Sequence, residues 1–194
     1  MSAPSPGLLL RASELIGRPV VTLSGELVAE IKDIVFERTG GRIAGFTLRN
    51  PGLFSRARKD SLPWQGVHGV GRDAVMISDE TVLVPAKEIA PRKETRKADV
   101  LEDRVLTDNG RDLGRVVDVV LHSAATLEVV GYEVEASETL GTGRRVLIPL
   151  PDTMAVSGEN LIVPAAATEF VSEDLAGFGA AVDAFRARLR EGTP

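Results

Sequence analysis

The chain contains an internal repeat, and this repeat constrains its fold more than any other feature of the sequence. Residues 17–36 (GRPVVTLSGELVAEIKDIVF) match residues 102–121 (EDRVLTDNGRDLGRVVDVVL) without a gap, at an offset of 85 positions. After one inserted residue the offset becomes 86, and the match continues to residues 75–77 and 161–163. Because a colinear series of this length is hard to obtain by chance, we interpret it as the duplication of one structural unit.

Each copy has the sequence pattern of several short β-strands. Residues 20–25 (VVTLSG) and residues 105–110 (VLTDNG) each read as a strand that ends in a turn, and the Asn-Gly pair of the second copy is a strong hairpin signal. In the strand that follows, the apolar spacing breaks strict alternation near Asp33 and Asp118, which predicts a β-bulge in each copy. No long helical pattern separates these strands, so an all-β fold of two small barrels or sandwiches is favoured over a parallel α/β fold.

The repeat divides the chain into two domains. We assign residues 8–90 to the first domain and residues 99–166 to the second, and we predict that the polar segment 91–98 (PRKETRKA) is a linker. The alternative is that this segment forms a solvated edge of one continuous domain. Because a unit of roughly 80 residues buries a modest core, we expect the two units to pack against each other as a fixed pair.

The last segment, residues 167–190, has the pattern of an amphipathic α-helix instead of strands. Residues 172–174 (SED) supply an N-cap and acidic groups for the first turn. Gly177 and Gly179 weaken the helix by about 1 kcal/mol each relative to Ala. The apolar stripe could dock on the chain's own barrels, or bind a partner or a second copy of the chain; the acidic start and lack of Lys disfavour a membrane surface. The stripe consists of Leu175, Phe178, Val182, Phe185 and Leu189.

The residue types needed for most catalytic and metal sites are missing or unpaired. The absence of Cys excludes a disulfide scaffold, a thiolate metal site and a thiol nucleophile. His68 and His122 have no second His or Cys at metal-ligand spacing, and neither a G-x-S-x-G elbow nor a full-length P-loop occurs. Asp33 and Asp118 could act in acid–base catalysis. Because they occupy equivalent positions in the two copies of a duplicated fold, a hydrogen bond at the turn or bulge is favoured instead. We therefore expect a non-enzyme with no catalytic residue, no metal and no cofactor.

Charge and hydropathy limit the classes of partner. The formal net charge is −5 and the pI is about 5.2, which argues against a protein that coats nucleic acid through a broad basic face. No apolar run reaches the about 18 residues that a transmembrane helix needs. The first residues, MSAPSPGLLLRASEL, lack both a basic leader and a long apolar core. We expect a cytoplasmic protein without a transmembrane segment.

The segment 50–59 (NPGLFSRARK) is the strongest candidate for a contact surface. It places apolar and aromatic residues at a Pro-Gly turn beside three basic residues, and such a combination can dock on a protein groove or stack on a nucleic-acid base. The alternative is that the apolar pair covers the barrel mouth while the basic residues remain solvated. Together with a nearby Trp and two aromatics of the helix, the predicted partner-binding residues are Leu53, Phe54, Arg56, Arg58, Lys59, Trp64, Phe178 and Phe185.

Both copies resemble the PRC-barrel family. In the first copy the resemblance rests on residues 13–20 (SELIGRPV), 31–35 (IKDIV) and 41–46 (GRIAGF), and in the second on residues 108–110 (DNG) and 113–120 (LGRVVDVV). The copies depart from each other at two positions. Ala29 stands where the second copy has Gly114, and Glu102 stands where the first has Gly17.

This resemblance implies two tandem small, strongly bent β-barrels. Members of the family include the cytoplasmic domain of the photosynthetic reaction centre H subunit, the C-terminal domain of a ribosome maturation factor, and stand-alone bacterial and archaeal adaptors. Their roles are mostly non-enzymatic docking, although fold analogy alone does not choose among them.

We therefore expect a cytoplasmic adaptor that acts through contacts with a protein partner whose identity the sequence does not give. A homodimer is a further expectation, and an RNA- or ribosome-associated factor is the alternative function. A third hypothesis, a small-molecule sensor with a pocket between the barrels, has no positive support from individual residues.

Overall fold

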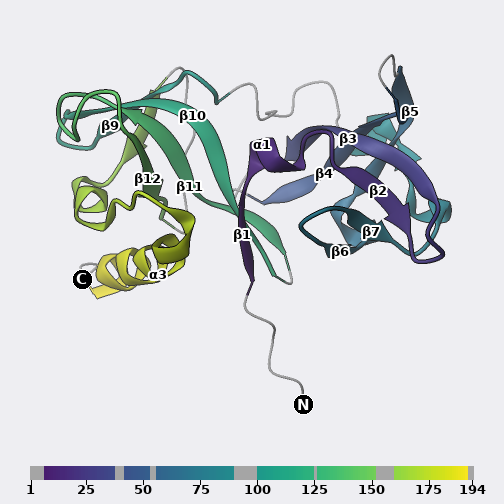
Figure 1. Ribbon diagram of the computed structural model, residues 1–194. Helices are drawn as coiled ribbons and strands as arrows, with labels where there is room; N and C mark the ends of the chain where they lie inside the picture. The colour runs from purple at the N-terminus through teal and green to yellow at the C-terminus, as the bar shows by residue number, and fades with distance from the viewer. Residues whose placement is uncertain are drawn as a thin grey trace.

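The structure is a computed structural model that describes residues 7–37, 42–52, 56–89, 100–124, 126–151 and 160–191. Within these ranges the chain forms two curved β-sheets in two lobes and ends in helix α3 (Leu175–Glu191), as Figure 1 shows. The expected fold class, all-β with two tandem barrel-like units and a C-terminal helix, is confirmed. The predicted linker, residues 91–98, lies outside the described residues.

The first lobe is a seven-stranded sheet with the order β6-β7-β2-β3-β4-β5-β8. β2 pairs antiparallel with β3 and parallel with β7, so the two ends of the repeat meet at β2. The strands are β2 (Pro19–Thr22), β3 (Leu27–Phe36), β4 (Ile43–Arg49), β5 (Ala57–Pro63), β6 (Val67–Val70), β7 (Val75–Ile77) and β8 (Val84–Pro85). Its short helical segments are η1 (Trp64–Gly66), η2 (Glu80–Val82) and α2 (Ala86–Ile89).

The second lobe has the strand order β12-β11-β10-β9-β13. Its strands are β9 (Arg104–Thr107), β10 (Asp112–Ser123), β11 (Leu127–Ala136), β12 (Arg145–Pro149) and β13 (Asn160–Val163). The parallel pair β9–β13 repeats the parallel pair β2–β7 of the first lobe, and β10, β11 and β12 repeat β3, β4 and β5. The two copies thus share one pairing scheme, which supports the duplication inferred from the sequence.

The first hairpin turn is built in the same way in both lobes. Gly25 and Gly110 have φ of +91° and +83°, a region that side chains disfavour. In each copy the threonine three positions earlier, Thr22 or Thr107, uses its hydroxyl oxygen to accept the backbone N–H four positions on, at 3.0 and 2.8 Å. Short polar side chains and glycine therefore fix the turn locally.

The two predicted β-bulges are confirmed. The register shifts between Ile31 and Asp33 on β3, and between Val116 and Asp118 on β10. In both bulges the aspartate Oδ1 accepts the backbone N–H of the following residue, at 2.9 and 2.8 Å. The matched carboxylates thus satisfy backbone donors that the extra residue would leave unpaired.

Glu102 of the second copy has the same backbone conformation as Gly17, the residue at the equivalent position of the first copy. Gly17 has φ of +81°, and Glu102 has φ of +71°, the only positive φ of a non-glycine residue in the described ranges. The backbone N–H of Gly17 donates to Ile31 O at 2.8 Å, and that of Glu102 donates to Val116 O at 2.9 Å. The fold therefore requires a left-handed residue at this position whichever residue the sequence supplies.

The first strand of the chain, β1 (Leu8–Arg11), crosses from the first copy to the second lobe. It pairs antiparallel with β10, from Leu8 opposite Ser123 to Arg11 opposite Val120. Helix α1 (Ala12–Leu15) follows it and leads into β2. One cluster of buried apolar side chains runs through both lobes, so the two units pack against each other, as expected from their size.

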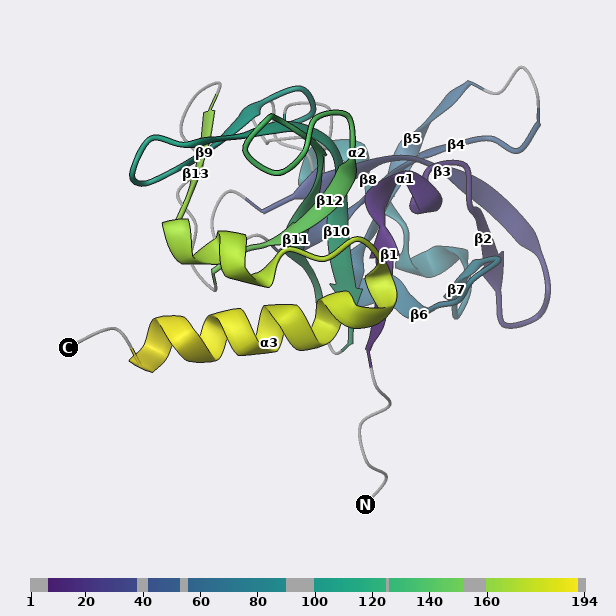
Figure 2. The same cartoon turned by 60° about the vertical axis from the view of Figure 1, so that its left-hand side comes forward.

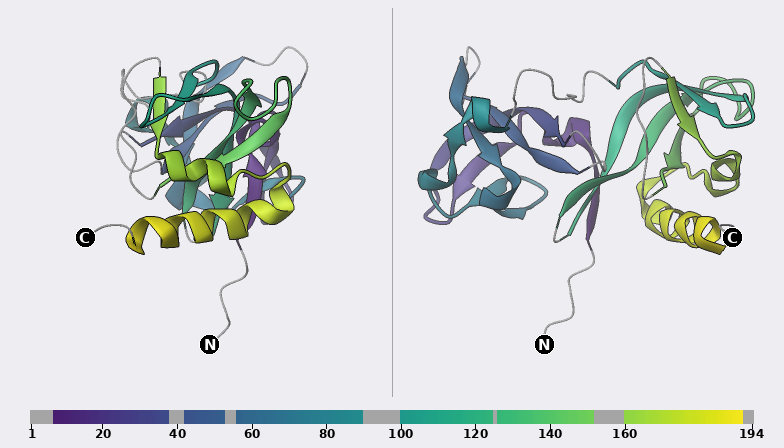
Figure 3. Two further views of the ribbon diagram at one scale, coloured as in Figure 1. Left: turned by 90° about the vertical axis from the view of Figure 1, so that its left-hand side faces the viewer. Right: turned by 180° about the vertical axis from the view of Figure 1, so that it is seen from behind.

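The C-terminal helix packs on the second lobe. Figures 2 and 3 show α3 beneath this lobe, at the side away from β2–β8. Asp174 caps the helix because its Oδ1 accepts the N–H of Gly177 at 3.0 Å, so the cap lies within the predicted residues 172–174. The prediction of acidic residues in the first turn is wrong, because the helix begins only after Asp174. The helix begins at Leu175 instead of residue 167, since η4 (Ala165–Phe170) forms a separate 3₁₀ segment. No helix in the described ranges is long and apolar enough to span a membrane.

Candidate functional site

The basic loop predicted from the sequence is described only in part. Leu53 and Phe54 lie outside the described residues. Arg56 and Lys59 are exposed at the end of the first lobe where β4 leads into β5, and Figure 1 shows this end projecting away from the second lobe. These two basic side chains are available to a partner.

Arg58, in contrast, is occupied within the first lobe. Its Nη1 donates to Val28 O at 2.9 Å, and its Nη2 donates to Asp60 Oδ2 at 3.1 Å and to Glu80 Oε2 at 3.2 Å. The side chain is 19% exposed. Successive residues of a strand point to opposite faces, so Lys59 faces solvent while Arg58 ties β5 to β3 and η2. These contacts give Arg58 an intramolecular role, and its contact with a partner stays a prediction.

Trp64 is at the opposite end of β5 from the basic loop. A strand of seven residues spans roughly 20 Å, so the structure does not bring Trp64 together with Arg56. The indole is half-buried against the core and also lines a pocket between the lobes.

This pocket has a volume of about 360 Å³, at the small end of ligand cavities. The first lobe contributes η1 and β6, and the second contributes the turn after β10. The lining combines apolar groups with an indole, an imidazole, an amide and a hydroxyl. The lining residues are Trp64, Gln65, Val67, His68, Gly69, Val70, Ser123 and Ala124. In the described part of the chain no group of three or more His, Cys, Asp or Glu could hold a metal ion.

Phe178 and Phe185 were predicted to contact a partner, but both are fully buried within the chain. Phe178 fits against Gly131 on β11, where an added Cβ would lie 2.3 Å from the phenyl Cζ. Phe185 packs against Phe170, with 5.6 Å between ring centroids. The amphipathic stripe therefore covers the second lobe, and these two side chains do not form an external surface.

The lobes are joined by a polar cluster that the sequence analysis did not find. Arg11 donates to both oxygens of Glu133, from Nε at 3.1 Å and from Nη2 at 3.0 Å, and this bidentate hydrogen bond raises the pKa of Arg11. The backbone N–H of Ser13 donates to Asp118 Oδ1 at 3.2 Å. The partners are more than 100 positions apart in sequence, so no local pattern could reveal them.

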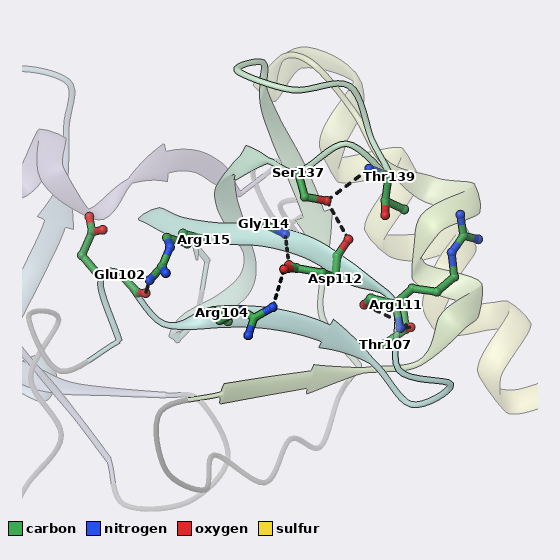
Figure 4. A network of polar contacts seen from close by, with 9 residues as sticks. All are labelled: Glu102, Arg104, Thr107, Arg111, Asp112, Gly114, Arg115, Ser137 and Thr139. Carbon is green, nitrogen blue, oxygen red and sulfur yellow. Dashed lines mark hydrogen bonds and ion pairs between the residues drawn. The ribbon is translucent and has the colours of Figure 1, made fainter.

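The outer face of the second hairpin, β9–β10, carries a network of polar contacts (Figure 4). Arg104 Nη2 donates to Asp112 Oδ2 at 2.6 Å, and the backbone N–H of Gly114 donates to Asp112 Oδ1 at 2.9 Å. Ser137 Oγ donates to the carbonyl of Asp112 at 2.6 Å. The hydrogen bond from Arg104 is the largest cause that lowers the pKa of the Asp112 carboxyl.

The matching face of the first hairpin, β2–β3, is apolar. Leu27 takes the position of Asp112 and Leu23 that of Asp108, at the offset of 85. These leucines are 51% and 56% exposed, the two most exposed large apolar side chains in the described ranges. The copies thus share an interior and a turn geometry but present different outer faces.

A family model for the PRC-barrel domain matches the chain twice, over residues 9–89 and 93–169. The two matches coincide with the two copies of the repeat and together cover most of the chain. A search of curated proteins gave no match.

Proposed function

Because the chain belongs to the PRC-barrel domain family, with two tandem domains, we propose that it is a non-enzymatic cytoplasmic adaptor that acts through protein–protein contacts. The observation that carries this proposal is the combination of a fixed pair of lobes with two different outer faces. An adaptor must hold distinct binding surfaces at a defined distance, and duplication followed by divergence of the outer faces supplies them.

Two features support a fixed distance between the surfaces. β1 precedes the first lobe in sequence but is hydrogen-bonded along β10 of the second, and Arg11 forms its bidentate pair with Glu133, whose side chain is 7% exposed. Detaching β1 and α1, which lead into the first lobe, from the second lobe would expose this carboxylate and the β10 edge, and separating the lobes would expose part of the shared core. Such a joint disfavours free movement of one lobe relative to the other.

The carboxylates that the sequence singled out have structural partners, which also supports a non-enzymatic role. Asp33 and Asp118 accept backbone N–H groups at the two bulges. Asp112 is held by Arg104 and by a backbone N–H. These contacts give each carboxylate a structural role that requires no catalytic one.

The alternative function, an RNA- or ribosome-associated factor, has its own supporting observation. Arg56 and Lys59 at the end of the first lobe, and Arg111 at the second hairpin turn, have exposed positions. Basic side chains are the groups that contact phosphates, and such binding weakens steeply with added salt.

Affinity capture of the tagged chain from its native lysate, with and without RNase, separates the two functions. The adaptor predicts one protein recovered stoichiometrically under both conditions. Ribosomal proteins that disappear with RNase would favour the alternative, and recovery of no protein would refute the adaptor. Arg56→Ala with Lys59→Ala tests the basic loop end, with Arg72→Ala, at an exposed position of the β6–β7 turn, as the matched control.

A further inference from the structure

We propose that the outer face of the β2–β3 hairpin docks a protein segment that combines aliphatic side chains with Lys or Arg. We call this face the leucine patch; it consists of Val21, Leu23, Leu27 and Met76. The inference rests on the proposed adaptor function and deepens it, because it assigns a surface and a partner chemistry to one of the two lobes.

The four side chains share one face of the first lobe. Val21 on β2 is the register partner of Leu27 on β3 and of Met76 on β7, and residues directly opposite each other in neighbouring strands lie on the same face. Leu23 follows Val21 by two positions, which returns it to that face. Val20 and Thr22, on either side of Val21, are buried, so the alternation places the patch outside and the core inside.

The leucines of the patch are not required by the hairpin itself. Asp108 and Asp112 occupy the same positions in the second lobe, where the turn and the strand pairing are equivalent. Asp108 Oδ1 accepts the N–H of Ala165 at 3.0 Å, and Asp112 is held by Arg104. A polar residue is therefore compatible with this hairpin geometry, and two adjacent exposed leucines indicate a contact surface instead of a folding requirement.

The surroundings of the leucine patch are acidic. Residues 19–31 and 73–86, which form and flank it, contain no Lys or Arg. Glu26 lies in the turn between the two leucines, and Leu23 N–H donates to Ile77 O at 2.9 Å, two residues before Asp79. Within the described residues, Glu26 and Asp79 are exposed and form no ion pair.

The second lobe has the opposite charge at the matching positions. Arg111 takes the position of Glu26, and Arg115 takes that of Glu30; Glu30 itself pairs with Arg49 at 2.7 Å. The acidic rim of the leucine patch repels nucleic acid and anionic lipid headgroups. It is complementary to a segment in which Lys or Arg flanks aliphatic side chains, which would bury the leucines and form ion pairs with Glu26 and Asp79.

The test uses the full-length chain and two labelled synthetic helical peptides with the same leucine stripe. One peptide carries Lys at the flanking positions and the other carries Glu. Fluorescence anisotropy measures binding to the wild type, to the double variant Leu23→Asp with Leu27→Asp, and to Ile162→Asp. Ile162 is the matched control because it is exposed on the equivalent face of the second lobe, at the position of Met76.

We expect the lysine peptide to bind the wild type and Ile162→Asp alike, and to bind the double variant at least tenfold more weakly. Added salt should weaken this binding, and the glutamate peptide should bind the wild type at least tenfold more weakly than the lysine peptide. Methyl NMR signals of Leu23, Leu27 and Met76 should shift when the lysine peptide is added. The double variant should keep the wild-type thermal midpoint, because the second hairpin tolerates Asp at both positions.

Three results would overturn the proposal: equal affinity of the lysine peptide for wild type and double variant, equal affinity of both peptides for the wild type, or no binding of the lysine peptide. Sedimentation of the wild type as an oligomer and of the double variant as a monomer would also overturn it, since the occupant would then be a second copy of the chain. Lysate capture separates this proposal from the adaptor function. If wild type and double variant retrieve the same protein in equal amounts, the adaptor function stands and the leucine patch fails; if neither retrieves a protein, the adaptor function fails.

Discussion

Replacing Glu102 with Gly should stabilise the protein. Glu102, two positions before β9, has φ of +71°, and its counterpart Gly17, two positions before β2, has φ of +81°. For an L-residue with a side chain the left-handed region costs roughly 1–2 kcal/mol, because Cβ approaches the following carbonyl oxygen. Glycine has no Cβ and avoids this penalty.

The magnitude follows from what the substitution removes and what it leaves in place. The Glu102 side chain is exposed, and the hydrogen bond from Arg115 Nη1 is to the main-chain carbonyl of Glu102, at 3.2 Å, so both variants keep it. Glycine loses about 0.5–1 kcal/mol more conformational freedom on folding than a residue with a side chain. The net gain in the free energy of unfolding is therefore about 0.5–1 kcal/mol. In a chain of this size, each kcal/mol raises the thermal midpoint by about 2–4 °C.

Equilibrium unfolding in urea and differential scanning calorimetry measure this change. The matched control is Gly17→Ala, which should lower the free energy of unfolding by about 0.5–1 kcal/mol, from the same two terms with opposite sign. A Cβ at Gly17 would have Arg49 Nη2 as its nearest neighbour, at 3.5 Å, so a loss there reports the backbone conformation and not a clash. If Glu102→Gly leaves stability unchanged or lowers it while Gly17→Ala is neutral, the requirement for a left-handed residue at these positions is refuted.

Three further substitutions test other parts of the structure. Gly131→Ala should release the C-terminal helix, since the new Cβ would lie 2.3 Å from Phe178 Cζ; hydrogen exchange should show lost protection in α3, and unchanged protection would contradict the docking. Arg58→Ala should lower the free energy of unfolding by about 1.5–3 kcal/mol, the range for hydrogen bonds to charged groups, whereas Arg56→Ala should leave the urea midpoint unchanged. The pKa of Asp112 is lowered in the folded state, so its stabilisation is present above its unfolded pKa and is lost as pH falls through the folded value; Asp112→Asn should remove this acid-dependent part, and identical pH–stability profiles would rule the contribution out.

The elements that local sequence predicts are those whose hydrogen bonds close within a few residues. The hairpin turns depend on Gly25 and Gly110, the bulges on Asp33 and Asp118, and the helix cap on Asp174. In each case the donor and acceptor are at most four positions apart, so the residue types and their spacing are sufficient evidence. The repeat is independent evidence for these elements, because the same local pattern occurs twice in the chain.

The candidate site was harder to predict because side-chain partners come from distant segments. Periodicity correctly indicates that Phe178 and Phe185 lie on a buried face, but it carries no information about which surface buries them. Arg58 resembles its neighbours Arg56 and Lys59 in sequence and differs from them only in strand phase and in the position of Val28 on β3. Of the predicted contact residues, Arg56 and Lys59 are therefore exposed, whereas Arg58 is bonded within its own lobe.

The sequence by itself determined the duplication, the all-β class, the turns and bulges, and the C-terminal helix, since these follow from spacing and backbone preferences within each copy. Only the tertiary structure decided that β1 pairs with the second lobe, that Arg11 of this strand pairs with Glu133, and that α3 packs over Gly131. It also showed that the two hairpins present an apolar, acidic face and a polar face at equivalent positions. The physical reason is that backbone conformation is set by near neighbours, whereas burial and pairing of side chains depend on which distant surfaces meet.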